Sequence, residues 1–129
     1  MIIDSSAIVA ILRAENEADA FLTAIGNAAR CSMLAASFVE TAIVLTPARG
    51  AYRRDFDELV SDARIAIEPV AEGQVWIARR AYREYGKGSG HPAQLNFGDC
   101  FSYALAKDRD EPLLFKGNDS MHTDVRTVV

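Results

Sequence analysis

Four acidic residues lie beside segments whose composition is that of buried strands or helices. Asp4 ends the opening apolar run, and Asp119 follows the strand-like residues 112–115. Asp99 precedes the helical segment FSYALA, and Glu40 lies inside the otherwise apolar ASFVETAIVL. A glutamate is almost never fully buried without a partner, because an isolated carboxylate in apolar surroundings takes up a proton. A cation shared with other carboxylates removes that cost, so Glu40 is the acid that a purely structural role explains least well.

Carboxylates gathered in one pocket repel one another unless a divalent cation offsets their charge. Hard oxygen ligands without a nearby histidine or cysteine favour magnesium or manganese over zinc. Such clusters, often with two ions about 4 Å apart, hydrolyse phosphodiesters: one ion helps to generate hydroxide and the other stabilises the leaving oxygen. The candidate metal ligands and catalytic residues of such a phosphodiesterase are Asp4, Glu40, Asp99 and Asp119.

The aspartates also have purely structural interpretations. Asp4 and Asp99 lie where helices are expected to start, and an aspartate there caps free backbone N–H groups. Asp119 and Asp124 lie in GNDSMHTD, whose small polar residues favour turns. The choice between the two interpretations depends on whether the acids converge in the folded chain.

Strand-like and helical segments alternate along the chain. Strands are expected at residues 1–4, 30–34, 65–70, 112–115 and 125–129, and helices at residues 6–13, 35–45, 52–63, 73–85 and 101–108. Residues 87–95 are a loop, because they are rich in glycine, proline and small polar residues. Ser5 or Ser6 is the expected cap of the first helix. The helix at 35–45 is expected to be buried, and Trp76 is expected to pack in the core.

This alternation predicts an α/β fold with a central, mostly parallel sheet flanked by helices on both faces. In a doubly wound sheet of this kind, ligands bind outside the carboxyl ends of the strands. Asp4 and Asp119 directly follow strands, and Asp99 lies at a helix start. We therefore expect the acids to converge at one edge of the sheet.

Length and composition are those of one ordinary globular domain. The chain has 129 residues, of which 50% are apolar and 25% charged, so one domain over residues 1–129 is expected. No apolar run approaches the roughly 20 residues that span a bilayer, and the opening segment lacks the basic start of a secretory signal. Cys31 and Cys100 have no CxxC spacing and are expected to be buried thiols in a reducing, cytoplasmic compartment. The net charge of −4 argues against binding of nucleic acid over the whole surface.

Several segments together resemble the VapC-type toxins of the PIN-domain ribonuclease family. They are the opening MIIDSSAIVAIL, the central SFVETAIVL, and the succession LNFGDCFSYALA, PLLFKGND and TDV, which together extend over nearly the whole chain. The resemblance implies a PIN-domain fold and a magnesium-dependent endoribonuclease, with manganese as a substitute, that cleaves structured RNA. It also implies the toxin half of a type II toxin–antitoxin pair, held inactive by a cognate VapB-type antitoxin, and a homodimer. The RNA is expected to be a loop of transfer or ribosomal RNA.

The acids of the family's motif match this chain residue by residue. They match Asp4, Glu40, Asp99 and Asp119, and the resemblance implies that Asp4 and Asp99 are the principal metal ligands. Asp124 matches the acid of the terminal TD pair, whose role stays open. One position departs from the pattern: the family commonly has an aromatic residue after its fourth acid, whereas this chain has Ser120. Because of this departure, the packing of the loop that positions Asp119 is expected to differ from the family's.

Basic residues that might contact RNA fall in two groups and two single positions. The groups are Arg79, Arg80 and Arg83 on one predicted helix and Arg49, Arg53 and Arg54 near the start of another. Most of these are expected on solvated faces balanced by neighbouring acids rather than on phosphates. Lys87 and Lys116 lie closer to the predicted acids and are the better candidates to meet substrate.

Two other functions compete with the ribonuclease interpretation. A haloacid-dehalogenase-type phosphatase needs a second acid two residues after its nucleophilic aspartate, whereas Asp4 is followed by Ser5 and Ser6. The second alternative is a catalytically silent binding module that keeps the fold for contact with a partner. Because all of the family's four acids are present, the enzyme is favoured over the silent module.

Overall fold

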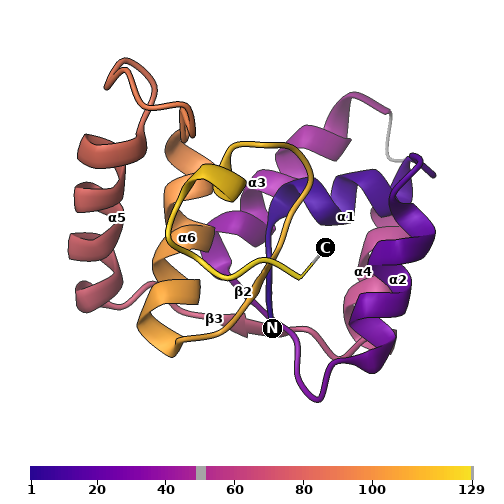
Figure 1. Ribbon diagram of the computed structural model, residues 1–129. Coiled ribbons are helices and arrows are strands. Elements are labelled where there is room, and N and C mark those ends of the chain that lie inside the picture. The colour runs from indigo at the N-terminus through magenta and orange to yellow at the C-terminus, as the bar shows by residue number, and fades with distance from the viewer. Residues whose placement is uncertain (49–51, 129) are drawn as a thin grey trace.

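A four-stranded parallel sheet forms the centre of the molecule. The computed structural model describes residues 1–48 and 52–128 (Figure 1). The strands are β1 (Ile2–Ile3), β2 (Ser32–Leu34), β3 (Ala66–Glu68) and β4 (Leu113–Leu114), in the order β3-β2-β1-β4. Ile2 of β1 is in register with Ser32 on one side and with Leu113 on the other, and each pair of neighbours is parallel. The predicted α/β class with a parallel central sheet is confirmed.

Helices cover both faces of this sheet. They are α1 (Ser5–Leu12), α2 (Ala18–Asn27), α3 (Ala35–Leu45), α4 (Arg53–Asp62), α5 (Glu72–Tyr85) and α6 (Phe97–Arg109), with 3₁₀ turns η1 (Thr46–Ala48) and η2 (Ser120–His122). Figure 1 shows α5 and α6 on one side of the strands and α1, α2 and α4 on the other. None of the helices in the described part of the chain is long and apolar enough to cross a membrane.

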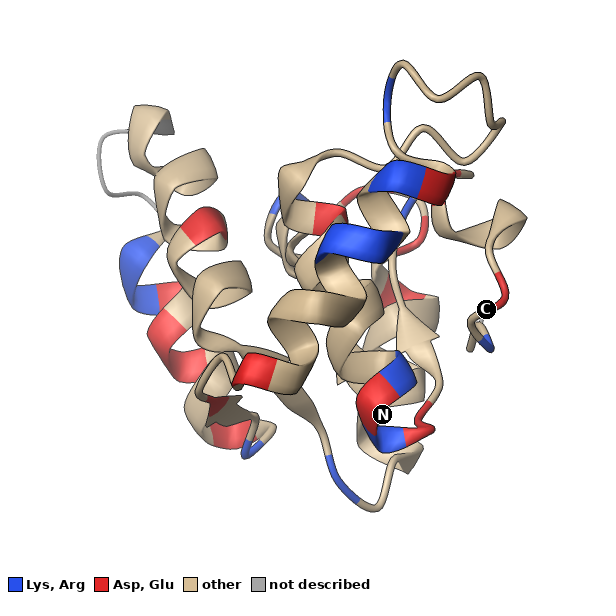
Figure 2. Cartoon of the chain, turned by 90° about the vertical axis from the view of Figure 1, so that its left-hand side faces the viewer, with Lys and Arg blue, Asp and Glu red and all other residues tan. Residues whose placement is uncertain are grey.

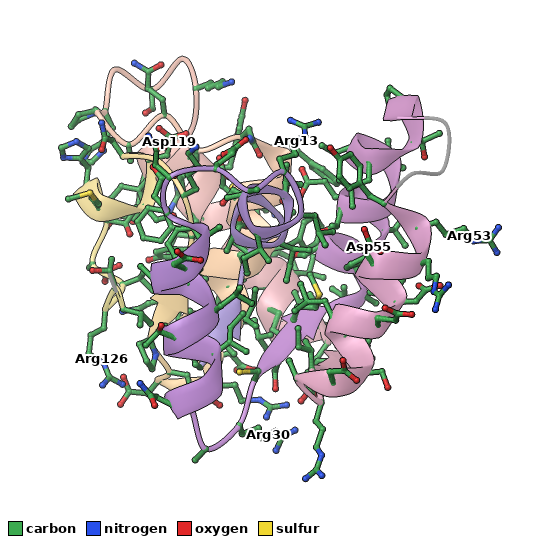
Figure 3. The ribbon with its side chains drawn as sticks, turned by 90° about the vertical axis from the view of Figure 1, so that its right-hand side faces the viewer. Arg13, Arg30, Arg53, Asp55, Asp119 and Arg126 are labelled. Carbon is green, nitrogen blue, oxygen red and sulfur yellow. The ribbon has the colours of Figure 1, made fainter. Side chains whose placement is uncertain are left out.

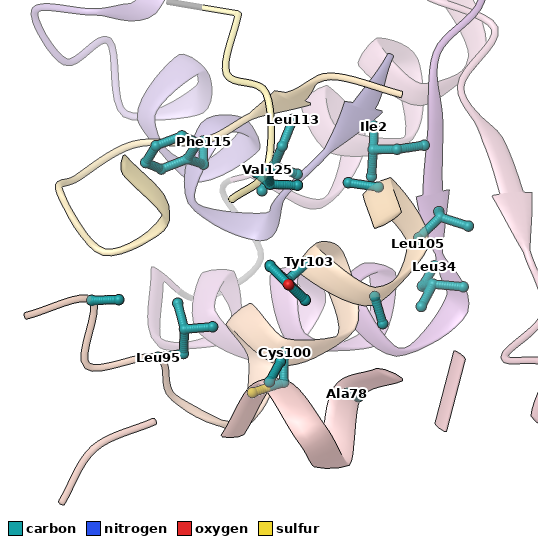
Figure 4. Close-up of a cluster of buried hydrophobic side chains, with 14 residues drawn as sticks. Ile2, Leu34, Ala78, Leu95, Cys100, Tyr103, Leu105, Leu113, Phe115 and Val125 are labelled. Carbon is teal, nitrogen blue, oxygen red and sulfur yellow. The ribbon is translucent and has the colours of Figure 1, made fainter. Parts of the chain in front are cut away.

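The apolar strands supply both halves of the core, because successive side chains of a strand point to opposite faces. Ile2 and Leu113 pack with residues of α5 and α6 in one cluster (Figure 4). Ile3 and Leu114 pack with residues of α1, α2 and α4 in the other. All four side chains are fully buried. Runs of large apolar residues without polar alternation are therefore required here, as in other sheets covered on both faces.

The main differences from the sequence-based expectations are a helix that was not predicted, an earlier helix start and a strand that does not form. Helix α2 was not predicted, because its alanine- and glycine-containing sequence has few large apolar residues; its buried stripe is Ala18, Phe21 and Ile25. Helix α6 begins at Phe97, earlier than residue 101, because Asn96 caps it. No fifth strand forms in the described residues up to 128, where an isolated bridge between Leu113 and Thr127 takes its place. Val129 and Arg49 lie outside the described residues.

Two predictions about burial were wrong. Helix α3 buries Ser37, Thr41 and Leu45 on one face, while other large apolar side chains of the helix remain exposed. The exposed ones are Val39 at 55%, Ile43 at 65% and Val44 at 40% of their accessible surface. Trp76 is 58% exposed on α5 and lies outside the core. The buried residues are Ser37, Thr41 and Leu45 on α3, and Gln74, Ala78 and Ala81 on α5. Other large apolar side chains of both helices therefore lie on the outer faces.

Candidate metal centre

The predicted acids lie around the carboxyl edge of the sheet. Asp4 directly follows β1, and Glu40 lies on α3, the helix that follows β2. Asp99 lies in the first turn of α6, and Asp119 in the segment after β4. In Figure 3, Asp119 lies at the opposite end of the molecule from Arg30, which precedes β2 and marks the amino ends of the strands. Each acid thus lies on a segment at this edge of the sheet, and their convergence on one cation stays a prediction.

Asp4 is held by three hydrogen bonds from described donors. It is the N-cap of α1, so the structural interpretation of Asp4 as a helix cap is confirmed, whereas Ser5 and Ser6, the other expected caps, lie inside the helix. Its Oδ2 accepts bonds from the Ser6 backbone N–H at 2.8 Å and the Ser6 hydroxyl at 2.5 Å. Its Oδ1 accepts a bond from the Ser102 hydroxyl at 2.6 Å. Because the side chain is only 3% exposed, these donors hold the carboxylate in one orientation.

Glu40 is partly buried between α1 and α6. The Ser5 hydroxyl donates to its Oε2 at 2.8 Å. On the other side, its carboxylate rests against Gly98, where a Cβ atom would come within 2.1 Å of Oε1. Burial raises the pKa of Glu40, the bond from Ser5 opposes that shift, and the charge of Asp4 adds to it. Gly98 is thus required by the position of Glu40, a contact that the sequence analysis missed.

Asp99 combines a helix cap with a strongly perturbed carboxyl group. Its Oδ2 accepts from the backbone N–H of Asn96 at 2.7 Å, and the Asn96 side chain accepts from the backbone N–H of Asp99 at 2.9 Å. This capping box satisfies donors of the first turn of α6. Burial is the main cause that raises the pKa of Asp99 to about 6; the bond from Asn96 opposes it, while the charges of Asp4, Asp119 and Glu40 raise it further. The four acids therefore influence one another electrostatically.

Asp119 occupies the most open position. It is the exposed residue that precedes η2, and its side chain makes no capping bond there. Ser120, which stands where an aromatic residue was expected, is buried with 5% exposure. A small hydroxyl side chain thus fills that buried position, and the following turn is closed by a bond from the Thr123 hydroxyl to the Ser120 carbonyl at 2.7 Å.

Asp124 is engaged away from the other acids. Its carboxylate accepts from the Tyr103 hydroxyl at 2.6 Å and from Lys107 Nζ at 2.9 Å. These donors, led by the tyrosine, lower the pKa of Asp124. Lys107 lies in the last turn of α6, whereas Asp99 lies in the first. The contacts of Asp124 thus tie the C-terminal segment to α6 and leave it outside the group formed by Asp4, Glu40, Asp99 and Asp119.

The four acids have no basic partner in the part of the chain that the structure describes, since none of its ion pairs involves them. Lys116, a predicted substrate contact, forms ion pairs with Glu15 and Glu17 instead. Figure 2 shows basic and acidic positions interspersed on the α5 side of the molecule, where Arg79, Arg80 and Arg83 are exposed. The charge of Lys116 is thus neutralised by ion pairs, and the arginines of α5 lie on a surface of mixed charge.

The donor set suits a hard divalent cation. Carboxylate oxygens are the preferred ligands of magnesium and manganese. A cation would offset both the burial of the Asp99 carboxylate, which is the main cause of its raised pKa, and the smaller contribution from the charges of Asp4, Asp119 and Glu40. Among the described residues, no three acidic, histidine or cysteine side chains are already grouped as a closed metal-binding cluster. The ligand chemistry and the charges that act on Asp99 therefore fit a cation, although the acids do not form a closed cluster in the described residues.

Comparison with known proteins agrees with this fold. The family model described as PIN domain matches residues 1–126, and the chain belongs to the PIN-domain family. The chain is 54% identical to ribonuclease VapC28 of Mycobacterium tuberculosis over 98% of its own length and 96% of the relative's. It is 46% identical to ribonuclease VapC42 of the same organism, over 98% of this chain and 97% of the relative. Within the PIN-domain family it is therefore a VapC-type protein.

A solved structure shares the fold at low sequence identity. The toxin–antitoxin complex from Klebsiella pneumoniae contains a chain that superposes with a TM-score of 0.72 over 99% of this chain and 95% of its own length. The two chains are 12% identical, so the likeness concerns the fold alone.

Proposed function

We propose that this chain is a magnesium-dependent endoribonuclease, the toxin component of a type II toxin–antitoxin system, which acts in the cytoplasm and accepts manganese in place of magnesium. Its relatives at 46–54% identity are named VapC ribonucleases. The observation that carries the metal-dependent mechanism is the group of four acids at the carboxyl edge of the sheet, which has no basic partner in the described chain. The proposed domain extends over residues 1–129.

Asp4 and Asp99 would be the principal ligands of the cation, with Glu40 and Asp119 completing the site. A bound magnesium ion supplies Lewis acidity that activates water and stabilises charge on the phosphate group. The chain's own contribution is orientation. Hydroxyl groups of α1 hold Asp4 and Glu40, and a backbone N–H holds Asp99, so three carboxylates are held in place by neighbouring donors.

The proposed substrate is an RNA loop, of transfer or ribosomal RNA, because exposed bases of single-stranded RNA can be read individually. The proposed partner is a VapB-type antitoxin that directs a basic side chain at the acids, since a guanidinium binds carboxylates bidentately. We also propose a homodimer. Large apolar side chains exposed on α3 and α5, among them Ile43 at 65% and Trp76 at 58%, support burial of this surface by another chain.

Expression of the wild-type chain and of an Asp99→Asn variant tests this function. The wild type should arrest bacterial growth, co-expression of the neighbouring antitoxin should relieve the arrest, and purified protein should cleave RNA with magnesium or manganese but not with excess EDTA. Asp99→Asn should fold and neither arrest growth nor cleave RNA, because it removes a ligand charge and retains an oxygen. Equal cleavage by wild type in EDTA would exclude the metal mechanism. Soluble wild type that neither cleaves RNA nor affects growth would favour the silent binding module.

A further inference from the structure

Ser102 has a buried hydroxyl group that contacts Asp4, one of the four acids of the candidate metal centre. It lies on α6, three residues after Asp99, and is 1% exposed. Its Oγ lies 2.6 Å from Oδ1 of Asp4 and 3.2 Å from Oγ of Ser37 on α3, which is equally buried. The family resemblance that identified the acids assigned no role to either serine.

The direction of both hydrogen bonds follows from the number of protons available. An ionised carboxylate only accepts, and a serine hydroxyl has one proton to donate. Ser102 therefore donates to Asp4 and must accept from Ser37, so the protons run from Ser37 to Ser102 to Asp4. The hydroxyls of Ser37 and Ser102 both have a hydrogen-bond partner, which offsets the cost of burying them.

This chain of bonds decides which oxygen of Asp4 is available. A carboxylate oxygen has about two lone-pair positions. The two at Oδ2 are taken by the backbone N–H and the hydroxyl of Ser6. Oδ1 has one described donor, Ser102, which leaves its second lone pair for a cation. Without Ser102, Oδ1 would lose its described donor, and the carboxylate would be oriented only by the two bonds at Oδ2.

We propose that Ser102 is a positioning residue that presents Oδ1 of Asp4 to the metal, and that Ser37 in turn orients Ser102. The inference rests on the proposed metal-dependent function. It makes α6 responsible for two parts of the centre: Asp99 as a ligand and Ser102 as the holder of a ligand that lies 98 residues away in sequence. Replacement of a residue that orients a metal ligand in this way typically lowers the affinity for the metal by about 10–100-fold.

Titration of metal-free protein with MnCl₂ by calorimetry, alongside thermal unfolding in EDTA, tests the proposal. Ser102→Ala removes the donor and should weaken manganese binding at least tenfold. Ser102→Cys keeps the side-chain shape with a weaker donor and should fall between Ser102→Ala and the wild type; it also serves if the alanine variant does not fold. The matched control is Thr41→Val, because the Thr41 hydroxyl is as buried but donates only to the Ser37 carbonyl of its own helix.

A purely structural role would change unfolding and leave metal affinity alone. Manganese binding by Ser102→Ala or Ser102→Cys within twofold of wild type would overturn the positioning role, as would an equal loss in Thr41→Val. The Asp99→Asn variant separates this result from failure of the proposed function. If wild type binds manganese and Asp99→Asn does not, the metal centre stands whatever Ser102 does. If wild type and Asp99→Asn respond alike, the metal centre and the role of Ser102 are both rejected.

Discussion

Because Gly98 contacts the Glu40 carboxylate, the substitution Gly98→Ala should lower activity without lowering stability. In Gly98→Ala, the new Cβ would lie 2.1 Å from Oε1 and 2.4 Å from Oε2 of Glu40, whereas such contacts are essentially never below 3.0 Å. The carboxylate must therefore withdraw by roughly 1 Å, which breaks its alignment with the Ser5 hydroxyl. The atoms that move are the end of a flexible side chain, so the helix itself need not shift. A misplacement of about 1 Å in an active site can lower the rate by about 10²-fold.

The same substitution should leave the fold intact or stabilise it. Gly98 is the second residue of α6, and replacement of glycine by alanine in a compatible backbone stabilises a protein by about 0.4–1 kcal/mol. For a chain of 129 residues, that corresponds to an increase in melting temperature of about 1.5–4 °C. Gly73→Ala is the matched control, because Gly73 is the second residue of α5 and its Cβ would meet no atom within 4 Å.

Both variants should be compared by single-turnover cleavage of RNA in magnesium and by thermal unfolding in EDTA. We expect similar small increases in melting temperature and a loss of cleavage, about 10²-fold, in Gly98→Ala alone. Full cleavage by Gly98→Ala would refute the inference that Glu40 acts from its observed position. A melting temperature far below that of Gly73→Ala would show that the backbone, rather than the Glu40 side chain, absorbs the clash.

The remaining predictions concern pH and the C-terminal segment. The pKa of Asp99 is raised from 3.8 to about 6, so the folded state binds this proton more tightly than the unfolded state, and metal-free protein should lose stability as pH rises between these values. Asp99→Asn should lack this part of the pH-dependent loss of stability. In denaturant unfolding at pH 7 in EDTA, its free energy of unfolding should exceed that of wild type by about 1–2 kcal/mol, a figure reduced for the partial exposure of the carboxyl group. A free energy of unfolding below that of wild type would contradict this prediction. Asp124→Ala should destabilise the fold by about 1–2 kcal/mol, because the Tyr103 hydroxyl and Lys107 lose their partner, and amide exchange at residues 119–128 should accelerate. Unchanged exchange there would mean that Asp124 does not hold this segment.

The sequence predicted the fold class because the local signals agree with the tertiary arrangement. Short apolar runs such as Ile2–Ile3 and Leu113–Leu114 are buried on both faces, so their composition alone indicates covered parallel strands. Helix α2 was missed for the opposite reason. Its alanines and a glycine give little periodic signal, and its helical state depends on burial of Phe21 and Ile25 against the rest of the core.

Exposure was the property that local patterns predicted least well. Helix α3 is mostly apolar, but its buried residues are Ser37, Thr41 and Leu45, while Val39 and Ile43 are exposed. The pattern of the sequence does not state which face of such a helix meets a neighbour. Trp76 illustrates the same limit, because a large aromatic side chain has equal apolar character in a core and on a surface that binds another chain.

The sequence by itself predicted which acids are the candidates, since Asp4, Glu40, Asp99 and Asp119 follow strands or begin or interrupt helices in a recognisable order. Their surroundings were decided only by the tertiary structure. Contacts such as Ser102 to Asp4, 98 residues apart, and Ser5 to Glu40, 35 residues apart, arise when α1, α3 and α6 meet at the edge of the sheet. Ser102 orients the Asp4 carboxylate, and Gly98 leaves room for the Glu40 carboxylate, only because the packing of whole helices brings these groups within a few ångströms of each other. Residue types and their spacing determine the chemistry that each side chain can perform. The relative placement of helices distant in sequence decides which side chains come together in one site.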